Sequence, residues 1–275
     1  MIVFPNCKVN LGLRILRKRK DGYHDLETVF YPLDFFDVLE IQESDSSNSK
    51  LSFSTTGLPV ESNFNNLCAK AYELLKQDFP GLPSAVMHLH KVIPIGGGLG
   101  GGSADAAFAL KLINEKFGLE LTVQQLTNYA LQLGSDCPFF INNKPAYATG
   151  RGEELEELNL DLSGFKFIVV NPGILIRTSE AFEGIRPFVS KKSLKEIIGQ
   201  PIPTWKSELL NDFEATIFVQ HPEIRTIKNA LYEKGALYAS MSGSGSSVYG
   251  IFEKETQLDF DFPSHYVVKN LIGQL

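Results

Sequence analysis

The stretch PIGGGLGGGSADAA, from Pro94 to Ala107, contains six of the 23 glycines in this chain of 275 residues. Glycine loses more conformational entropy on folding than other residues do, and it packs no side chain. Such a density therefore indicates that the backbone has to approach another group closely. Because successive amide groups can form a concavity that binds anions, we interpret the stretch as a phosphate-binding loop.

The residues after the loop predict a helix. Apolar side chains recur at helical spacing from Ala106 to Phe117, Ser103 can cap the helix, and Gly118 can end it. Aligned peptide dipoles favour negative charge at a helix N-terminus. Loop and helix together predict a cradle for phosphate groups.

Two commoner phosphate loops fit less well. Gly97 and Gly102 have the spacing of the Walker glycines, but Ser103 stands where that motif requires Lys, which excludes it. The run from Gly96 also matches the dinucleotide-binding pattern G-x-G-x-x-G, a match that arises easily among so many glycines. That fold needs a strand after the helix, whereas residues 122–133 predict a second helix that begins with a capping box.

A flexible linker is the remaining alternative, and the flanking sequence disfavours it. A linker is polar and separates domains, whereas this loop contains Ile95 and Leu99 and follows a predicted strand, residues 85–91. On that strand His88 and His90 alternate with apolar residues. They could pair on a metal ion, but no third ligand stands nearby, so we interpret them as an exposed strand face.

Composition bounds the remaining possibilities. The chain is 43% hydrophobic and long enough for one large or two modest domains. No apolar run approaches the roughly 18 residues of a membrane span, and the start MIVFPNCK is too short an apolar stretch for a secretion signal, so we expect a cytoplasmic protein without a membrane partner. The three cysteines are far apart, which predicts buried packing rather than disulfides or a zinc site: Cys7, Cys68 and Cys137.

Charge argues against a nucleic-acid partner. The formal net charge is -6 and the pI is about 5.5, whereas a phosphate backbone needs a basic face. One basic cluster runs into Asp21-Gly22, a two-residue hairpin signal. We expect this cluster at a solvated hairpin tip, although positive potential near an anionic substrate is the alternative: Arg14, Arg17, Lys18, Arg19 and Lys20.

The second half of the chain contains another loop of small residues. Residues 150–164 are acidic and punctuated by glycine, so we divide the chain into domains 1–155 and 156–275. Farther on, SGSGSS at 242–247 lies between predicted strands 237–241 and 248–252. A hairpin connection explains this second loop when it is taken alone.

Three separated elements together resemble the GHMP kinases, which are ATP-dependent kinases of small molecules. They are PNCKVNLGL at 5–13, PIGGGLGGGSADAA at 94–107 and SMSGSGSSVYGIF at 240–252. The resemblance implies a two-domain α+β fold, with an N-terminal domain like the second domain of ribosomal protein S5 and a ferredoxin-like C-terminal domain. It also implies ATP and Mg2+ as cofactors. It does not indicate an oligomeric state.

Further motifs resemble the branch of that family that phosphorylates a cytidine diphosphate-linked sugar alcohol on the non-mevalonate route to isoprenoid precursors. They are KDGYHDLETVF at 20–30, LGSDCPFF at 133–140, ATGRGEEL at 148–155 and NDFE at 211–214. This implies transfer of phosphate from ATP to the 2-hydroxyl of that substrate. Two alternatives stay open: a kinase for another small acceptor such as homoserine or mevalonate, and a nucleotide-binding module without catalysis.

The resemblance places two charged residues at the acceptor hydroxyl. Phosphoryl transfer needs a phosphate cradle, a cation near the transferred group and a carboxylate at the attacking oxygen. Asp136 is implied as catalytic base or hydroxyl orienter, and Lys8 as the cation that keeps Asp136 ionised and offsets developing charge. Taken alone, Asp136 would be a turn residue and Lys8 a surface lysine on a strand. Asn10 shares the strand face of Lys8 and can hydrogen-bond the substrate.

The same resemblance implies the residues that bind the nucleotide. Ser103 offers its hydroxyl to a phosphate or to Mg2+. Asp105 has no settled role, being either an indirect magnesium partner or an acidic residue in the first helical turn. Asn66 and Leu67 are candidates for the adenine pocket. The remaining residues wrap the phosphates: Pro94, Ile95, Gly96, Gly97, Gly98, Leu99, Gly100, Gly101, Gly102, Ser103 and Ala104.

At the cytidine end, the resemblance implies an aromatic site. Tyr23 and Phe182 would stack on the base, which is worth about 1 to 3 kcal/mol per base, and His24 would hydrogen-bond its edge. Thr178 and the adjacent Arg177 would orient the substrate. The alternatives are an ordinary hairpin residue for Tyr23 and a helix-core residue for Phe182.

Overall fold

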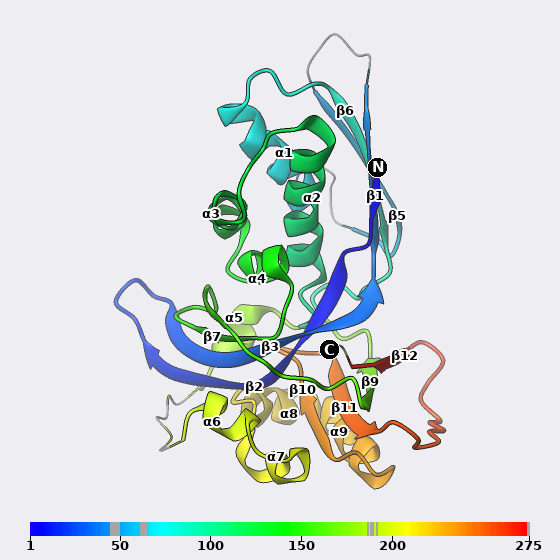
Figure 1. Cartoon of the computed structure of the whole chain (residues 1–275). Helices are drawn as coiled ribbons and strands as arrows, with labels where there is room; N and C mark the ends of the chain where they lie inside the picture. The colour runs from blue at the N-terminus through cyan, green and yellow to red at the C-terminus, as the bar shows by residue number, and fades with distance from the viewer. Residues whose placement is uncertain (45–49, 61–64, 186, 188–189, 191, 274–275) are drawn as a thin grey trace. The chain divides into compact units, whose positions relative to one another are not determined.

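Two compact units make up the chain, and neither is contiguous in sequence (Figure 1). A computed structural model describes residues 1–44, 50–60, 65–185, 187, 190 and 192–273. The first unit contains Met1–Cys7, Phe36–Ile95 and Gly100–Asn143, and the second contains Lys8–Phe35, Gly96–Leu99 and Lys144–Leu275. This division differs from the one expected at residue 155, because strands near the N-terminus join a sheet with strands that follow residue 145.

The first unit packs helices on a four-stranded sheet (Figure 1). Its strand order is β1 (Ile2–Val3), β4 (Val38–Glu43), β6 (Ala85–Lys91) and β5 (Leu51–Gly57); only β5 and β6 are parallel. The helices are α1 (Leu67–Asp78), α2 (Gly101–Phe117), α3 (Val123–Leu133) and α4 (Cys137–Asn142). Buried residues of β6 alternate with exposed ones, as the sequence predicts for a half-buried strand.

The helix predicted after the glycine run is α2, and one detail of that prediction is wrong. Gly118 ends the helix in the left-handed conformation, as expected. The N-cap, however, is Gly100 (φ 69°) rather than Ser103, which lies inside the first turn. Glycine adopts this conformation without strain, so the helix starts within the glycine run and needs no side-chain cap. The second predicted helix is α3, with a complete capping box between Thr122 and Gln125.

The two strand histidines take part in a polar ladder rather than a metal site. His88 hydrogen-bonds the hydroxyls of Ser54 (2.8 Å) and Thr56 (2.9 Å) on β5, and His90 bonds Thr56 (2.9 Å). Among the residues with described positions, no group of three or more His, Cys, Asp or Glu side chains could hold a metal ion. The three cysteines are free and buried, as expected.

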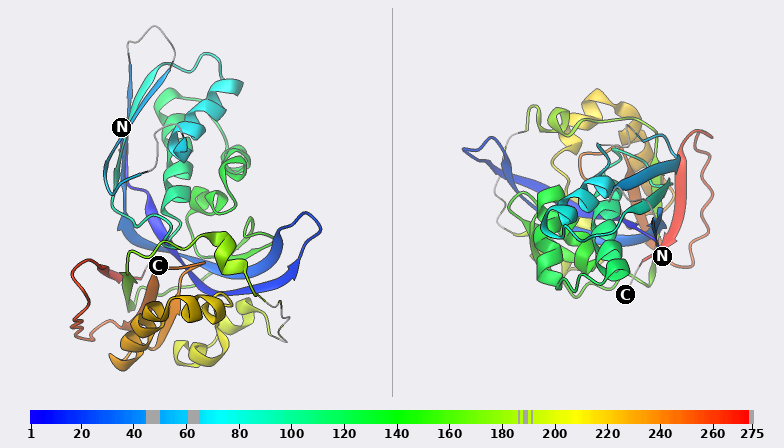
Figure 2. Two further views of the ribbon diagram at one scale, coloured as in Figure 1. Left: turned by 180° about the vertical axis from the view of Figure 1, so that it is seen from behind. Right: turned by 90° about the horizontal axis from the view of Figure 1, so that it is seen from above.

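The second unit contains two four-stranded sheets (Figure 2). One has the order β2 (Asn6–Lys18), β3 (His24–Phe36), β7 (Ala146–Thr149) and β8 (Glu154–Glu157). The other is antiparallel, in the order β10 (Tyr238–Met241), β11 (Val248–Glu253), β9 (Phe165–Asn171) and β12 (Val267–Ile272).

Short helices complete the second unit. They are α5 (Thr178–Phe182), α6 (Leu194–Ile198), α7 (Ile202–Glu208), α8 (Glu214–Gln220) and α9 (Pro222–Glu233). Helix α9 packs on β10 and β11, and apolar side chains of α8, α9 and the sheet form one buried core. No helix in the described ranges has the length and apolarity that a membrane crossing requires.

The predicted hairpin forms between β2 and β3, with Asp21 and Gly22 in the turn. Arg14 is the exception in the basic cluster expected at its tip. Only 8% of Arg14 is exposed, and its guanidinium donates to Glu27 Oε1 (3.2 Å) and to the carbonyl of Lys192 (2.6 Å). A buried guanidinium requires a carboxylate partner, and the distant Glu27 on β3 supplies it.

Candidate active site

The predicted phosphate-binding loop joins β6 to α2, and its glycines adopt a backbone conformation that other residues avoid. Gly96, Gly98 and Gly100 have positive φ angles of 65°, 74° and 69°, which L side chains rarely adopt. In the described part of the chain, no backbone amide of residues 96–100 donates a hydrogen bond. These five consecutive amides directly precede a 17-residue helix, an arrangement consistent with the predicted anion-binding concavity, which stays a prediction.

The second glycine loop packs directly on the first. Residues 242–247 join β10 to β11 as a hairpin, as expected. Ser242 Oγ donates to the carbonyl of Gly98 (2.7 Å), and the Ser247 amide donates to the carbonyl of Gly97 (3.1 Å). A Cβ on Gly98 would lie 1.9 Å from the Ser242 carbonyl oxygen, so only glycine permits this approach. The glycine run therefore forms an ordered contact surface rather than a flexible linker.

Neutral side chains hold the second loop in place. Asn211, the first residue of the NDFE motif, donates from Nδ2 to the carbonyls of Met241 and Gly243, both at 2.8 Å. Asn171 at the end of β9 donates to Ser247 Oγ (2.9 Å). These partners are buried, so each hydrogen bond replaces water that is no longer accessible.

Lys8 is buried at the loop and is no surface lysine. Lys8 lies on β2 and is only 3% exposed. Its Nζ donates to Asn10 Oδ1 (2.5 Å) and to the Gly98 carbonyl (3.2 Å). Nζ also lies 4.9 Å from the centroid of the Phe30 ring. Asn10 shares the strand face of Lys8, as alternation predicts, and its Nδ2 donates to Thr28 Oγ1 (2.9 Å). The structure thus brings a lysine ammonium to the phosphate-binding loop.

Asp136 belongs to the first unit, whereas Lys8 belongs to the second. It is half-buried and precedes α4, at the N-cap position. Cys137 follows it. Burial raises the pKa of the Cys137 thiol to about 12, and the charge of Asp136 adds a smaller contribution in the same direction. A hydrogen bond with Ser103 opposes this shift. Ser103 in the first turn of α2 and the start of α4 are therefore neighbours. The pairing of Asp136 with Lys8 stays a prediction.

The predicted adenine residues have local structural roles. Asn66 is the N-cap of α1, where its Oδ1 accepts the Cys68 amide (2.9 Å), and Leu67 is the first residue of that helix. Asp105 on α2 is 3% exposed and accepts from Lys91 Nζ (2.7 Å). Burial raises the pKa of Asp105 to about 7 against the opposing charge of Lys91.

Lys91 was not among the predicted site residues, yet its position in the strand indicates a buried lysine. The buried residues of β6 follow one another at every second position, and Lys91 occupies the next position of the same series. A lysine on the buried face of a strand requires buried acidic partners. Alternation could therefore have identified it.

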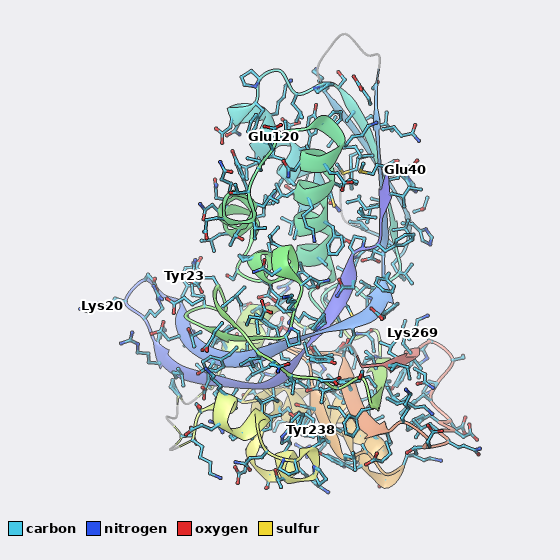
Figure 3. The ribbon with its side chains drawn as sticks, viewed as in Figure 1. Lys20, Tyr23, Glu40, Glu120, Tyr238 and Lys269 are labelled. Atoms are coloured by element: carbon cyan, nitrogen blue, oxygen red, sulfur yellow. The ribbon has the colours of Figure 1, made fainter. Side chains whose placement is uncertain are left out.

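The expected cytidine residues lie in the second unit, where His24 pairs with Phe182 and Tyr23 pairs with a residue that was not predicted. The rings of His24 and Phe182 stack with centroids 4.5 Å apart and an interplanar angle of 14°. Tyr23 is 56% exposed beside the hairpin turn, near the position of Lys20 in Figure 3, and the Arg151 guanidinium carbon lies 4.8 Å from its ring centroid. Arg151 belongs to the ATGRGEEL motif but was not among the predicted residues.

Helix α5 holds the other expected substrate residues. Thr178 and Arg177 are exposed at its start. Phe182 is half-buried and also packs edge-on against Phe213, with ring centroids 4.9 Å apart. One side of the Phe182 ring is therefore packed inside the protein, as in the alternative that it is a helix-core residue. Burial lowers the pKa of His24, and the charge of Lys18 lowers it further. The imidazole that stacks on Phe182 is therefore favoured in its neutral form.

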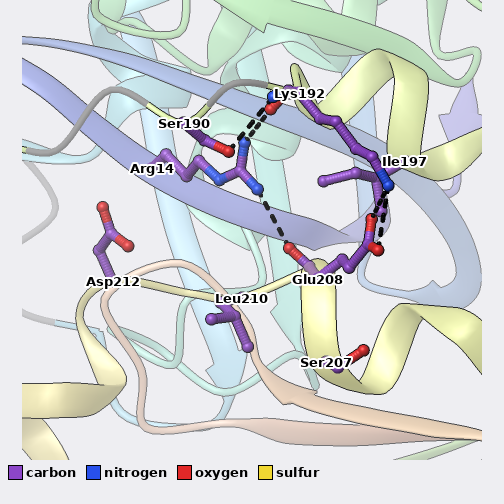
Figure 4. A pocket seen from close by; sticks show the side chains of 8 residues that line it. All are labelled: Arg14, Ser190, Lys192, Ile197, Ser207, Glu208, Leu210 and Asp212. Atoms are coloured by element: carbon purple, nitrogen blue, oxygen red, sulfur yellow. Dashed lines mark hydrogen bonds and ion pairs between the residues drawn. The ribbon is translucent and has the colours of Figure 1, made fainter.

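A separate cavity of about 500 Å3 lies in the second unit (Figure 4). Arg14 donates across it to the Glu208 carbonyl (3.1 Å), and Lys192 pairs with the Glu208 carboxylate (2.9 Å). None of the predicted site residues lines it; Arg14, Lys192 and Glu208 take part in ion pairs, and Asp212 accepts the Ile15 amide (2.8 Å). Its lining residues are Arg14, Ser190, Lys192, Ile197, Ser207, Glu208, Leu210 and Asp212.

Comparison with known proteins decides the family. A family model described as the GHMP kinases N terminal domain matches residues 66–144, and one described as GHMP kinases C terminal matches residues 192–261. A Bacteroides fragilis protein named 4-diphosphocytidyl-2-C-methyl-D-erythritol kinase is 51% identical over 265 residues, which cover 95% of this chain and 96% of that protein. The chain belongs to the GHMP kinases.

Other relatives and solved structures agree with this assignment. A Bacteroides thetaiotaomicron protein of the same name is 51% identical over 259 residues, or 94% of each chain. A crystal structure of 4-(cytidine 5'-diphospho)-2C-methyl-D-erythritol kinase has a TM-score of 0.81 and 28% identity over the whole of both chains. The Methanococcus jannaschii mevalonate kinase, at 14% identity and a TM-score of 0.71, shares the fold. The expected two-domain α+β GHMP kinase fold is confirmed, and with it a small-molecule kinase that uses ATP as its phosphate donor.

Proposed function

We propose that this GHMP kinase transfers the γ-phosphate of ATP to the 2-hydroxyl of 4-diphosphocytidyl-2-C-methyl-D-erythritol, on the non-mevalonate route to isoprenoid precursors. The observation that carries the proposal is the identity of about half of all residues with proteins of that name over nearly the whole chain. The five unpaired amides of residues 96–100 support the transfer of a phosphoryl group in particular.

We assign the proposed roles of the site residues from their charges. The amides of the phosphate-binding loop bind the ATP phosphates, and the N-terminus of α2 adds its positive dipole end. The Lys8 ammonium, beside the Gly98 carbonyl, offsets the charge that develops on the transferred group. Asp136 orients the acceptor hydroxyl and accepts its proton. Asn10 keeps Lys8 in place through its Oδ1 and, in this proposal, also bonds the substrate.

Mg2+ fits these residues as an ion held mainly by phosphates. Mg2+ keeps several waters and usually takes only one or two protein ligands besides the substrate phosphates. The Ser103 hydroxyl, in the first turn of α2, is the protein ligand that we propose. Asp105 is not a ligand in this proposal, because its buried carboxylate is bonded to Lys91. Once bound, the ion would neutralise part of the phosphate charge.

To bind the cytosine base, either His24 and Phe182 have to move apart or the base has to stack on one aromatic ring alone. A base cannot lie between His24 and Phe182 while their centroids are 4.5 Å apart. Tyr23 offers an exposed ring with Arg151 on one of its faces, so we assign the other face of Tyr23 to the base. His24 then recognises the base edge, and Thr178 contacts the substrate from the start of α5.

A substrate panel tests the proposal directly. We expect the purified protein with ATP and Mg2+ to phosphorylate the cytidine diphosphate-linked alcohol and to leave homoserine and mevalonate unchanged, as followed by ADP release and phosphorus NMR. Asp136→Asn should lower kcat at least about 100-fold while the protein still binds ATP. The exposed Asp259→Asn is the matched control and should keep full activity. Binding of the cytidine substrate without phosphate transfer by the unaltered protein would reject the proposal.

A further inference from the structure

We propose that three buried charged side chains, Asp37, Lys91 and Asp105, position the phosphate-binding loop by clamping both of its ends. They are positioning residues, since none of them lines the loop itself. The inference rests on the use of ATP by this kinase and is independent of which acceptor it phosphorylates.

The three side chains come from separate elements of the first unit. Asp37 lies between β3 and β4, Lys91 ends β6, and Asp105 lies near the start of α2. Lys91 Nζ donates to the carboxylate of Asp37 and to Asp105 Oδ2 (2.7 Å). No more than 4% of any of the three residues is exposed, so these ion pairs are shielded from solvent.

The clamp grips the chain where it enters the loop. Asp37 Oδ1 accepts the backbone amides of Val92 (2.6 Å) and Ile93 (2.8 Å), the two residues that precede Pro94. A single carboxylate therefore fixes the direction in which the chain leaves β6. Two charge-assisted hydrogen bonds to one oxygen leave this segment little freedom to rotate.

The same cluster grips the chain where it leaves the loop. Asp105 is part of α2, so its bond to Lys91 ties the first turns of that helix to the end of β6. A Cβ on Gly101, the first residue of α2, would lie 3.0 Å from Lys91 Nζ and 2.9 Å from Ile93 Cγ2. The ammonium therefore lies against the helix start, and Lys91 fixes the separation between the two ends of the loop.

The energetics of the cluster favour a role in geometry over one in stability. Two carboxylates surround one ammonium, and Asp105 Oδ1 is buried with no hydrogen-bond partner in the part of the chain that the structure describes. Burial would lower the pKa of Lys91, but the charges of Asp105 and Asp37 outweigh burial and raise it. Buried ion pairs are often no more stable than apolar residues of similar volume. What the ions add is a fixed direction for each contact.

Replacing one ion pair by apolar side chains separates the two roles. The double variant Lys91→Met/Asp105→Leu leaves the buried Asp37 without its ammonium, and we expect it to stay folded because Asp37 Oδ1 still accepts the amides of Val92 and Ile93. Its affinity for a non-hydrolysable ATP analogue, measured by calorimetry, should fall at least tenfold. The KM for the acceptor should change less than twofold. A matched exchange of the exposed pair, Lys144→Met/Glu157→Leu, should leave both values unchanged.

A second pair of variants decides the question if the double variant does not fold. Asp105→Asn keeps an acceptor for Lys91 and should bind the analogue as the unaltered protein does, whereas Asp105→Ala should bind it at least tenfold more weakly. A folded double variant with unchanged analogue affinity would overturn the proposal, as would equal affinities of Asp105→Asn and Asp105→Ala. Because analogue binding needs no acceptor, a wrong acceptor assignment would leave this result intact.

Discussion

The two glycine-rich loops of this kinase contact each other, yet opposite chemistry holds them. The loop at 94–102 is held at its base by the buried ions Asp37, Lys91 and Asp105. The loop at 242–247 is held along its length by neutral groups, chiefly the amides of Asn211 and Asn171. Both loops contain glycines with positive φ, so glycine content alone does not distinguish them.

The difference follows from what each loop does with its backbone amides. Among the described residues, the amides of residues 96–100 donate no hydrogen bond, so the first loop is held by donors outside it that reach the carbonyls of Gly97 and Gly98, and by the ions at its ends. The second loop uses half of its amides: Ser242 and Gly245 donate within the loop and Ser247 donates to Gly97, while the other three amides donate to no group among the described residues. The first loop therefore depends on groups outside itself, including buried ions, whereas the second loop is held partly by its own hydrogen bonds and partly by neutral side chains.

Adding one methyl group to each loop should give the largest effect. Gly98→Ala would place a Cβ at positive φ, 1.9 Å from the backbone oxygen of Ser242, which cannot rotate away. We expect kcat/KM for ATP to fall at least about 100-fold and the protein to lose roughly 3 kcal/mol of stability. Gly243 also has positive φ, but the Cβ of Gly243→Ala would lie no nearer than 3.3 Å to another group, Asn10 Oδ1, so its loss should be smaller.

Steady-state kinetics and thermal unfolding measure this contrast. Gly199→Ala is the control, because Gly199 has a φ of -74° and an added Cβ would make ordinary contacts at 3.7 Å or more. Equal activity of Gly98→Ala and Gly243→Ala would show that the close approach of the loops does not matter for ATP use.

A charge introduced at the residue that holds the second loop should give the next largest effect, a loss of stability. Asn211→Asp has nearly the same shape, but its carboxylate would face the carbonyls of Met241 and Gly243 without a proton to donate. We expect the free energy of unfolding to fall by about 3 kcal/mol, since two buried acceptors lose their donor. The reverse exchange in the clamp, Asp105→Asn, should cost less, because Lys91 and Asp37 remain paired.

Urea unfolding gives these free energies, with the exposed Asn270→Asp as the control for the chemical change alone. If Asn211→Asp were as stable as the unaltered protein, the second loop would not depend on neutral donors, and the contrast between the loops would fail.

Local signals predicted most of the fold, and the missing parts depend on distant partners. The capping box of Thr122 and Gln125 predicted where α3 begins, because both residues act within one helical turn. The start of α2 was misplaced at Ser103, since glycine itself provides the left-handed cap at Gly100. Cap preferences favour polar side chains, so a glycine run conceals the true helix start.

The same limit applies to the site. The glycine loop and the helix that follows it could be predicted because their signals lie in consecutive residues, and the phosphate-binding role stays a prediction. Arg14 was placed at a solvated tip because Glu27, which holds it inside, lies on the next strand. The clamp was missed because Asp37 and Lys91 are 54 positions apart, and only the fold brings them together.

The smallest expected effect extends the comparison to the proposed cytidine site, where the stacked pair of His24 and Phe182 is also neutral. Burial and the charge of Lys18 lower the pKa of His24 below its ordinary 6.5, so the folded protein favours the neutral imidazole. As the pH falls below about 6.5, the unfolded chain takes up this proton first, and stability decreases. Above that pH both states are neutral at His24, and this residue contributes no pH dependence.

Thermal midpoints across this pH range measure the effect, and a histidine NMR titration assigns it. The slope of the midpoint with pH should flatten in His24→Gln, which cannot take up a proton. Phe182→Leu should flatten it partly, because the smaller side chain covers less of the imidazole that now stacks 4.5 Å from it. A titration midpoint of His24 above 6.5 would mean that a negative group outweighs burial at this site, and the neutral character of the cytidine end would then be wrong.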